Sequence, residues 1–218
     1  MITVHHLNNS RSQRILWMLE ELAQPYEIVK YERDPKTMLA PASLRAIHPL
    51  GKSPVISYNG ATIAESGAIL DYLVDTYGKG LLSPPPGTAE HRDYTYFMHY
   101  AEGSLMPFLV MKLVFGKVAT DAPFLVRPIA KVIADTVGKQ YLNPNIEAHA
   151  KFLADHLAKH AWFAGDKFTA ADIQMSYAVE GLVTRGGVKL PKLTEWLQKI
   201  QARPAYKKAL EKAGESKA

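Results

Sequence analysis

The stretch SPVISYNGATIAESGAI, residues 53–69, decides the fold. It contains two short β-prone runs, 55–57 and 62–64, joined across Asn59-Gly60, the dipeptide that most strongly favours a two-residue hairpin turn. A helix is predicted directly afterwards, over 66–77, where apolar residues recur at helical spacing. The order strand, strand, helix is therefore expected in this part of the chain.

Upstream of this stretch, strand and helix signals alternate. Residues 2–6 and 26–29 have the composition of short strands, and residues 12–22 between them place Ile, Leu and Met at helical spacing. A weaker helical pattern follows over 38–47. The predicted order for residues 1–80 is therefore β-α-β, α, β-β-α, which makes this part an α/β domain.

Downstream of residue 80 the β pattern disappears. Residues 81–87 read LLSPPPG, a proline-rich segment in which no helix persists, and they are predicted to be a linker. Residues 88–218 show the patterns of five or six helices. We therefore expect an α/β domain over 1–80, a linker over 81–87 and an all-α domain over 88–218.

The sequence contains no cysteine. Disulfides, thiolate zinc sites, iron–sulfur clusters and cysteine nucleophiles are therefore excluded. His149, His156 and His160 share helical spacing, but no carboxylate stands at ligand spacing beside them, so solvent exposure explains them better than a metal site. No metal is expected.

The net charge is +5, and the basic excess lies after residue 80. The basic segment 191–218 lacks the interleaved aromatic residues of nucleic-acid readers, so no nucleic-acid partner is expected. The longest nearly apolar run, 105–115, is shorter than the ~20 residues of a transmembrane helix, so no membrane association is expected either. The first residues do not have the pattern of a secretory signal, and we expect a cytoplasmic protein.

Pro54 stands directly before the strand predicted over 55–57. If the Ser53–Pro54 peptide bond is cis, the chain turns sharply there, and the backbone groups of Ser53 are free to pair with an extended peptide ligand. A trans proline at the start of a strand is the alternative, since only ~5–6% of X-Pro bonds in folded proteins are cis. The residue pattern leaves both open.

Glu65 and Ser66 stand between a predicted strand and a predicted helix. Ser66 is suited to the N-cap position, and the free N–H groups at a helix N-terminus attract carboxylates, whereas Glu65 is suited to an ammonium group. Together they would recognise an amino-acid head group. A purely structural cap is the alternative.

Ser10 and Ser12 stand where the first predicted strand turns into the first predicted helix. A hydroxyl at a helix N-terminus can donate a hydrogen bond to a bound thiolate and lower the pKa of that thiol. Ordinary capping by either serine is the alternative. The chain has no G-x-S-x-G turn, so acyl transfer through a serine nucleophile is not expected.

Five phrases occur in the order and spacing of a cytosolic glutathione S-transferase, which the chain resembles over nearly its whole length. They are SRSQRILW at 10–17, PLGKSPV at 49–55, ESGAI at 65–69, GDKFTAAD at 165–172 and RPAY at 203–206. In the fourth phrase, Thr169 is expected to cap a helix and Asp172 to reach back to it, which is a capping box. The first phrase and HYAEGSL at 99–105 most resemble a bacterial and fungal branch related to the yeast enzymes.

The resemblance implies a thioredoxin-like N-terminal domain that binds glutathione as a co-substrate, without a cofactor. It implies a serine-type active site in which Ser10 donates its hydroxyl hydrogen to the glutathione sulfur and keeps it as a thiolate. Ser12 is the second candidate for this role, and the backbone amide of Ser10 or Arg11 is a third.

The same resemblance implies which residues hold glutathione. Ser53, beside a cis Pro54, would pair its backbone with the cysteine of glutathione. Lys52 would face the glycine carboxylate. Glu65 with Ser66 would hold the γ-glutamyl group.

The implied activity is conjugation of glutathione to hydrophobic electrophiles in detoxification, with glutathione-dependent peroxidase activity as an addition. A homodimer is implied, with Glu102 or His99 near glutathione in the same chain or across the dimer interface. The electrophile pocket is expected between residues 7–10 and a long helix whose candidate lining side chains are Tyr96, Tyr100, Met106, Phe108 and Met111.

Two alternatives remain within the resemblance. A glutathione-dependent isomerase of the maleylacetoacetate type would carry a Ser-Ser-Cys phrase, which is missing. A non-enzymatic binding module of the same fold would have no need of Lys52, the Ser53-Pro54 pair and the Glu65-Ser66 pair together.

Overall fold

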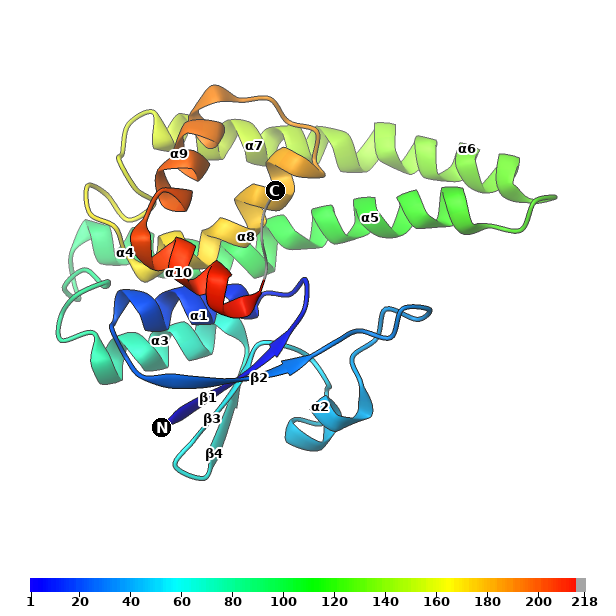
Figure 1. Cartoon of the computed structure of the whole chain (residues 1–218). Helices are drawn as coiled ribbons and strands as arrows, with labels where there is room; N and C mark the ends of the chain where they lie inside the picture. Colours follow the sequence, from blue (N-terminus) through cyan, green and yellow to red (C-terminus); the bar gives the residue numbers. More distant parts are fainter. Residues whose placement is uncertain (215–218) are drawn as a thin grey trace.

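The computed structural model describes residues 1–214 of the chain, and their first third alternates strands and helices (Figure 1). The elements are β1 (Ile2–Leu7), α1 (Ser12–Glu21), β2 (Tyr26–Tyr31), α2 (Ala42–Ile47), β3 (Val55–Tyr58), β4 (Ala61–Ala64) and α3 (Ser66–Tyr77). The predicted order of strands and helices is confirmed.

The prediction of a helix over 38–47 is wrong at its start, because α2 begins at Ala42. The reason is Pro41, the residue before the helix, whose backbone is extended. A proline disfavours helical backbone at the residue that precedes it and has no N–H to donate, so the helix cannot extend upstream.

The four strands form one sheet in the order β2-β1-β3-β4, with β1 parallel to β2 and the other two pairings antiparallel. Helices α1 and α3 lie between this sheet and the helical part of the chain (Figure 1). Neighbouring side chains of β1 point to opposite faces of the sheet. The His6 side chain therefore reaches α1, whereas the His5 side chain bonds to Tyr31 and Ser57 on the two neighbouring strands.

Residues 89–213 are mostly helical. The elements are α4 (Ala89–Tyr100), η1 (Ala101–Leu105), α5 (Met106–Asp121), α6 (Arg127–Val137), η2 (Gly138–Leu142), α7 (Asn143–Leu157), α8 (Ala170–Thr184), α9 (Pro191–Gln201) and α10 (Pro204–Ala213). The π-helical segments η1 and η2 join their neighbours into two long helices, 89–121 and 127–157. Each π-helical segment directly precedes a helix with a proline in its first turn, Pro107 or Pro144, whose missing N–H interrupts the regular hydrogen-bond ladder.

The long helix Ala89–Asp121 is the one described helix with the length and composition of a membrane span, although the sequence pattern predicted none. Its most apolar window has a mean hydropathy of 1.3 and is only 17% buried. A single helix of this kind is weak support for a membrane span, because core helices have the same composition. The second half of this apolar helix is therefore largely exposed, because few other side chains of the same chain pack against it.

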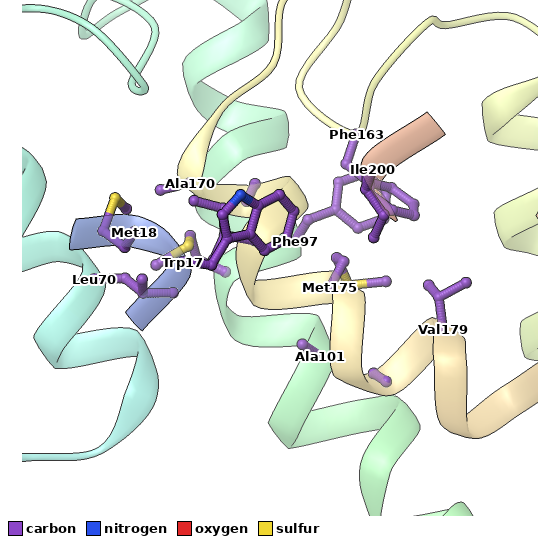
Figure 2. Packing of buried hydrophobic residues seen from close by; sticks show 14 of the residues in the cluster. Trp17, Met18, Leu70, Phe97, Ala101, Phe163, Ala170, Met175, Val179 and Ile200 are labelled. Atoms are coloured by element: carbon purple, nitrogen blue, oxygen red, sulfur yellow. The ribbon is translucent and has the colours of Figure 1, made fainter. Parts of the chain in front are cut away.

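One apolar core connects the two parts of the chain. Trp17 and Met18 of α1 lie in one cluster with Phe97 of α4 and Ala170 and Met175 of α8 (Figure 2). The Trp17 ring lies 5.6 Å from the Phe168 ring and 5.1 Å from the Tyr206 ring, centroid to centroid. Helix α1 is therefore held from both sides, which fixes the position of its N-terminus.

The capping box at the start of α8 is confirmed. Buried Asp172 accepts hydrogen bonds from the backbone N–H of Thr169 at 2.9 Å and from that of Phe163 at 3.0 Å. The box fixes where α8 begins, and α8 contributes to the site described next.

Candidate functional site

The loop between β1 and α1 brings two serine hydroxyls together. The Oγ atoms of Ser10 and Ser12 lie 2.7 Å apart, and the Ser10 side chain is only 5% exposed. Neither serine is the N-cap of α1, because Arg11 holds that position without a side-chain cap. The Ser10 hydroxyl does accept the N–H of Ser12 at 3.2 Å. It therefore sits at the positive end of the α1 dipole, where an anion is stabilised.

The loop before β3, which contains Ser53 and Pro54, contacts Ser10. The Ser53–Pro54 peptide bond is cis. The Ser10 hydroxyl donates to the hydroxyl of Ser53 at 3.3 Å, and Ser53 in turn donates to the backbone carbonyl of His5 at 3.0 Å. The structure thus brings Ser10, Ser12 and Ser53 to one place, although 43 positions separate Ser10 from Ser53 in the chain.

Ser66 is not the N-cap of α3, which corrects the sequence prediction. It is the first residue of the helix, and Glu65 holds the cap position with φ of 72°. That backbone conformation is rarely adopted by a residue with a side chain and costs about 1–3 kcal/mol, so the surrounding structure must hold it. Ser66 is buried and accepts a hydrogen bond from Arg14 at 3.3 Å.

Lys52 and Glu65 differ from the residues above because both are exposed. Within residues 1–214, neither side chain makes a hydrogen bond or an ion pair. Their charged ends are therefore available to a ligand, although the structure does not connect them to Ser10 through protein contacts.

Arg14 joins four elements at the centre of the site, and sequence reasoning did not identify it. Its side chain is 1% exposed and donates to Ser66 of α3, to Gln174 of α8 at 2.7 Å and to Glu102 of η1 at 2.6 Å. It also lies 5.2 Å from the ring of Tyr177. The only sequence signal was a charged residue before an apolar helical run, which a solvent-facing position explains equally well.

Glu102 pairs within the chain, with Arg14 and, at 2.8 Å, with Arg11. Burial by itself would raise the pKa of Glu102, but the two guanidinium groups and their hydrogen bonds outweigh burial and lower it. Glu102 is therefore held as a carboxylate. His99, the other residue expected near glutathione, is exposed on α4.

A cavity of about 210 Å³ opens beside Ser10. Its far wall is α8, and none of the residues that line it comes from the long helix 89–121. Tyr100 and Met106 are buried in the helical core, and the Tyr100 hydroxyl bonds to His149. The lining residues come from the loop, α1 and the end of α8, and they are Asn9, Ser10, Gln13, Tyr177, Glu180, Thr184 and Arg185.

The histidines considered for metal binding are half-buried, so the explanation by solvent exposure is wrong, and two of them have partners in the protein. His149 bonds to Tyr100, and His156 lies 3.0 Å from the backbone carbonyl of Phe163. Among residues 1–214 no group of three or more His, Asp or Glu side chains is arranged to hold a metal ion.

The chain is similar to known proteins over nearly its whole length. The family model described as "Glutathione S-transferase, N-terminal domain" matches residues 10–76, and "Glutathione S-transferase, C-terminal domain" matches residues 125–213. Glutathione S-transferase 3 of Schizosaccharomyces pombe is 37% identical over 97% of this chain and 88% of its own length. Glutathione S-transferase 1 of Saccharomyces cerevisiae is 31% identical over 98% and 95%. The crystal structure of a glutathione S-transferase from Actinobacillus pleuropneumoniae is 30% identical, with a TM-score of 0.79 over 98% of this chain and 93% of that one.

Proposed function

This chain belongs to the glutathione S-transferase family, with relatives among the yeast enzymes, and we propose that it activates the glutathione thiol at Ser10 for attack on hydrophobic electrophiles. Glutathione is then a co-substrate, and the protein needs no cofactor. We propose glutathione-dependent reduction of organic hydroperoxides as a further activity of the same thiolate, because both reactions begin with the sulfur anion.

One observation carries this proposal: a buried serine hydroxyl at the N-terminus of α1, 3.3 Å from the cis-proline loop. A free thiol with a pKa of ~8.5 is only a few per cent ionised at neutral pH. A donated hydrogen bond and the positive end of a helix both favour the charged form. The chain has no cysteine, so the reacting sulfur must come from the ligand.

We assign glutathione to the surface formed by the β1–α1 loop, the loop before β3 and the start of α3. Ser53 would pair its backbone with the cysteine of glutathione beside Pro54. The free charges of Lys52 and Glu65 support their assignment to the glycine carboxylate and the γ-glutamyl ammonium. Ser66 would bind the γ-glutamyl carboxylate with the first N–H groups of α3.

The electrophile is assigned to the cavity beside Ser10. Tyr177 provides an aromatic surface there, and the Arg11 side chain lies 5.2 Å from its ring. Catalysis would consist mainly of holding the thiolate and the electrophile together, which is worth several kcal/mol of activation free energy. We further propose a cytoplasmic protein in which residues 1–80 bind glutathione, residues 81–87 link, and the part from residue 88 completes the electrophile site.

The test is titration calorimetry with reduced glutathione, combined with the thiolate absorbance of the complex as the pH is varied. We expect binding, with the pKa of the bound thiol lowered by about 2 units. S-methylglutathione is the control, because it should bind without an absorbance change. No binding at millimolar glutathione would instead favour the non-enzymatic binding module.

We propose that the protein is a homodimer, on the grounds of an uncovered apolar surface. Helices α5 and α6 form an arm that extends from the body of the molecule (Figure 1). Phe124 and Leu125 at its tip are 81% and 87% exposed. The exposed apolar residues along it are Val110, Leu113, Val114, Val118, Val126, Ile129, Val132 and Ile133.

We propose that a second copy of the chain covers the exposed apolar residues of this arm. Contiguous apolar patches of this kind mark interaction sites, and most soluble oligomers are symmetric homo-oligomers. The arm carries charges of both signs on each helix. Lys117 and Asp121 lie on α5, and Lys131 and Asp135 lie on α6. A two-fold arrangement can therefore set opposite charges against one another.

The dimer prediction can be checked by sedimentation velocity. We expect the wild-type protein to sediment as a dimer and the double variant Ile129→Lys, Val132→Lys to dissociate, because two charges would be buried at the contact. Gln198→Lys, which adds a charge at an exposed position of α9 outside the arm, is the control and should remain dimeric. A wild-type monomer that binds anionic lipid vesicles would contradict the proposal and assign the arm to a membrane surface.

A further inference from the structure

A third residue continues the pair of serine hydroxyls into the sheet. The Nδ1 atom of His6 lies 2.8 Å from the Oγ of Ser12, which lies 2.7 Å from the Oγ of Ser10. His6 is 2% exposed and comes from β1, on the face that α1 covers. Three side chains thus form one buried chain of hydrogen bonds that ends at the hydroxyl assigned to the glutathione sulfur.

The count of hydrogens in this chain allows one arrangement with a thiolate. Each serine hydroxyl has a single hydrogen. In the structure Ser10 donates this hydrogen to the hydroxyl of Ser53, and a bound sulfur would replace Ser53 as its acceptor. In either case Ser12 must donate across the 2.7 Å contact with Ser10. Ser12 then has no hydrogen left for His6, so Nδ1 of His6 must carry the hydrogen and donate it to Ser12.

The opposite arrangement withdraws the hydrogen from the sulfur. If Nδ1 of His6 carries no hydrogen, it accepts from Ser12, and Ser12 accepts from Ser10. The Ser10 hydrogen then points into the protein. Hydrogen bonds in such a chain polarise one another. The presence of a hydrogen on Nδ1 of His6 therefore influences the donor strength at Ser10.

We propose that His6 is a positioning residue for the thiolate: through its Nδ1 hydrogen it orients Ser12, and through Ser12 it directs the Ser10 hydrogen to the glutathione sulfur. The inference rests on the proposed function, in which the sulfur lies at Ser10. No covalent step is involved.

The first test compares two His6 variants by the thiolate absorbance of the glutathione complex. His6→Phe keeps a ring but removes the donor, and it should raise the pKa of the bound thiol by about one unit, which from a starting value of about 6.5 is roughly a threefold fall in the thiolate fraction at pH 7. His6→Asn places an amide N–H near the position of Nδ1 and should restore a value close to that of the wild type. His5→Asn is the matched control, because the His5 side chain bonds to Tyr31 and Ser57 instead, and its backbone carbonyl is unchanged.

The second test needs no variant. In ¹⁵N NMR spectra of the wild-type protein labelled on histidine, Nδ1 of His6 should carry hydrogen when the sulfur of bound glutathione is ionised. Nδ1 without hydrogen in the thiolate complex would overturn the inference, even if His6→Phe fails to fold.

The outcomes separate this inference from the proposed function. Absence of glutathione binding by the wild-type protein removes the proposed function itself. Normal binding with an unchanged thiol pKa in folded His6→Phe, or the same increase in His6→Phe and His6→Asn, removes only the role of His6.

Discussion

Replacing Ser10 with alanine is expected to lower kcat with an aryl halide electrophile about 10- to 100-fold and to change glutathione affinity only a few fold. The Ser10 hydroxyl is buried at the N-terminus of α1 and has the position to donate to a sulfur anion. A hydrogen bond to a charged group contributes roughly 1.5–3 kcal/mol, and each 1.4 kcal/mol corresponds to a factor of ten. The loss should fall on kcat, because the hydrogen bond is made to the ionised sulfur rather than to the peptide of glutathione.

Steady-state kinetics and the thiol pKa together check this expectation. Ser57→Ala is the control, because the Ser57 hydroxyl bonds to His5 and lies away from Ser10. Ser12→Ala should reduce kcat less than Ser10→Ala, since Ser10 keeps its own hydrogen for the sulfur. Unchanged kcat in Ser10→Ala with a large loss in Ser12→Ala would transfer the catalytic role to Ser12.

Replacing Arg14 with methionine is expected to lower the free energy of unfolding by about 3–5 kcal/mol. Methionine fills much of the volume of arginine but leaves Glu102 with one guanidinium partner and removes the donors to Ser66 and Gln174. The partly buried carboxylate of Glu102 then loses one of its two cations, and two buried oxygens lose a donor, which costs far more than loss of an exposed ion pair. Arg14→Lys should be intermediate, because one ammonium cannot reach all three acceptors.

Urea unfolding measures this loss, with Lys151→Met as the matched control. Lys151 pairs with Asp155 on the surface of α7, with both side chains mostly exposed, and its replacement should cost under about 1 kcal/mol. Equal losses in the two variants would show that the Arg14 network contributes no special stability.

The loss in free energy of unfolding caused by Arg14→Met should depend on pH in a defined direction. The pKa of Glu102 is lowered in the folded protein from its ordinary value of 4.5. Its ion pairs therefore contribute full stability above that value, and the contribution is lost as the pH falls through the lower, folded pKa. The difference between wild type and Arg14→Met should shrink on acidification below 4.5. A difference that grows on acidification would contradict this account.

Short-range signals explain what could be predicted. The Asn59-Gly60 turn, the capping box of Thr169 and Asp172 and the order of strands and helices all depend on residues a few positions apart, and the structure agrees with each. The errors were also local in cause: Pro41 shortens α2, and the cap of α3 falls on Glu65 rather than Ser66.

The sequence by itself determined the α/β and helical halves, because turn chemistry, capping and periodicity act between neighbours along the chain. Its five phrases also carried the resemblance to the family, which the comparisons bear out. The tertiary structure alone decided that α8 lines the cavity beside Ser10, and that Arg14 meets Glu102 and Gln174. Those two contacts join residues 88 and 160 positions apart, and burial of α1 between the sheet and α8 brings them together. No local sequence pattern predicts these contacts of Arg14, because they depend on how the whole core packs.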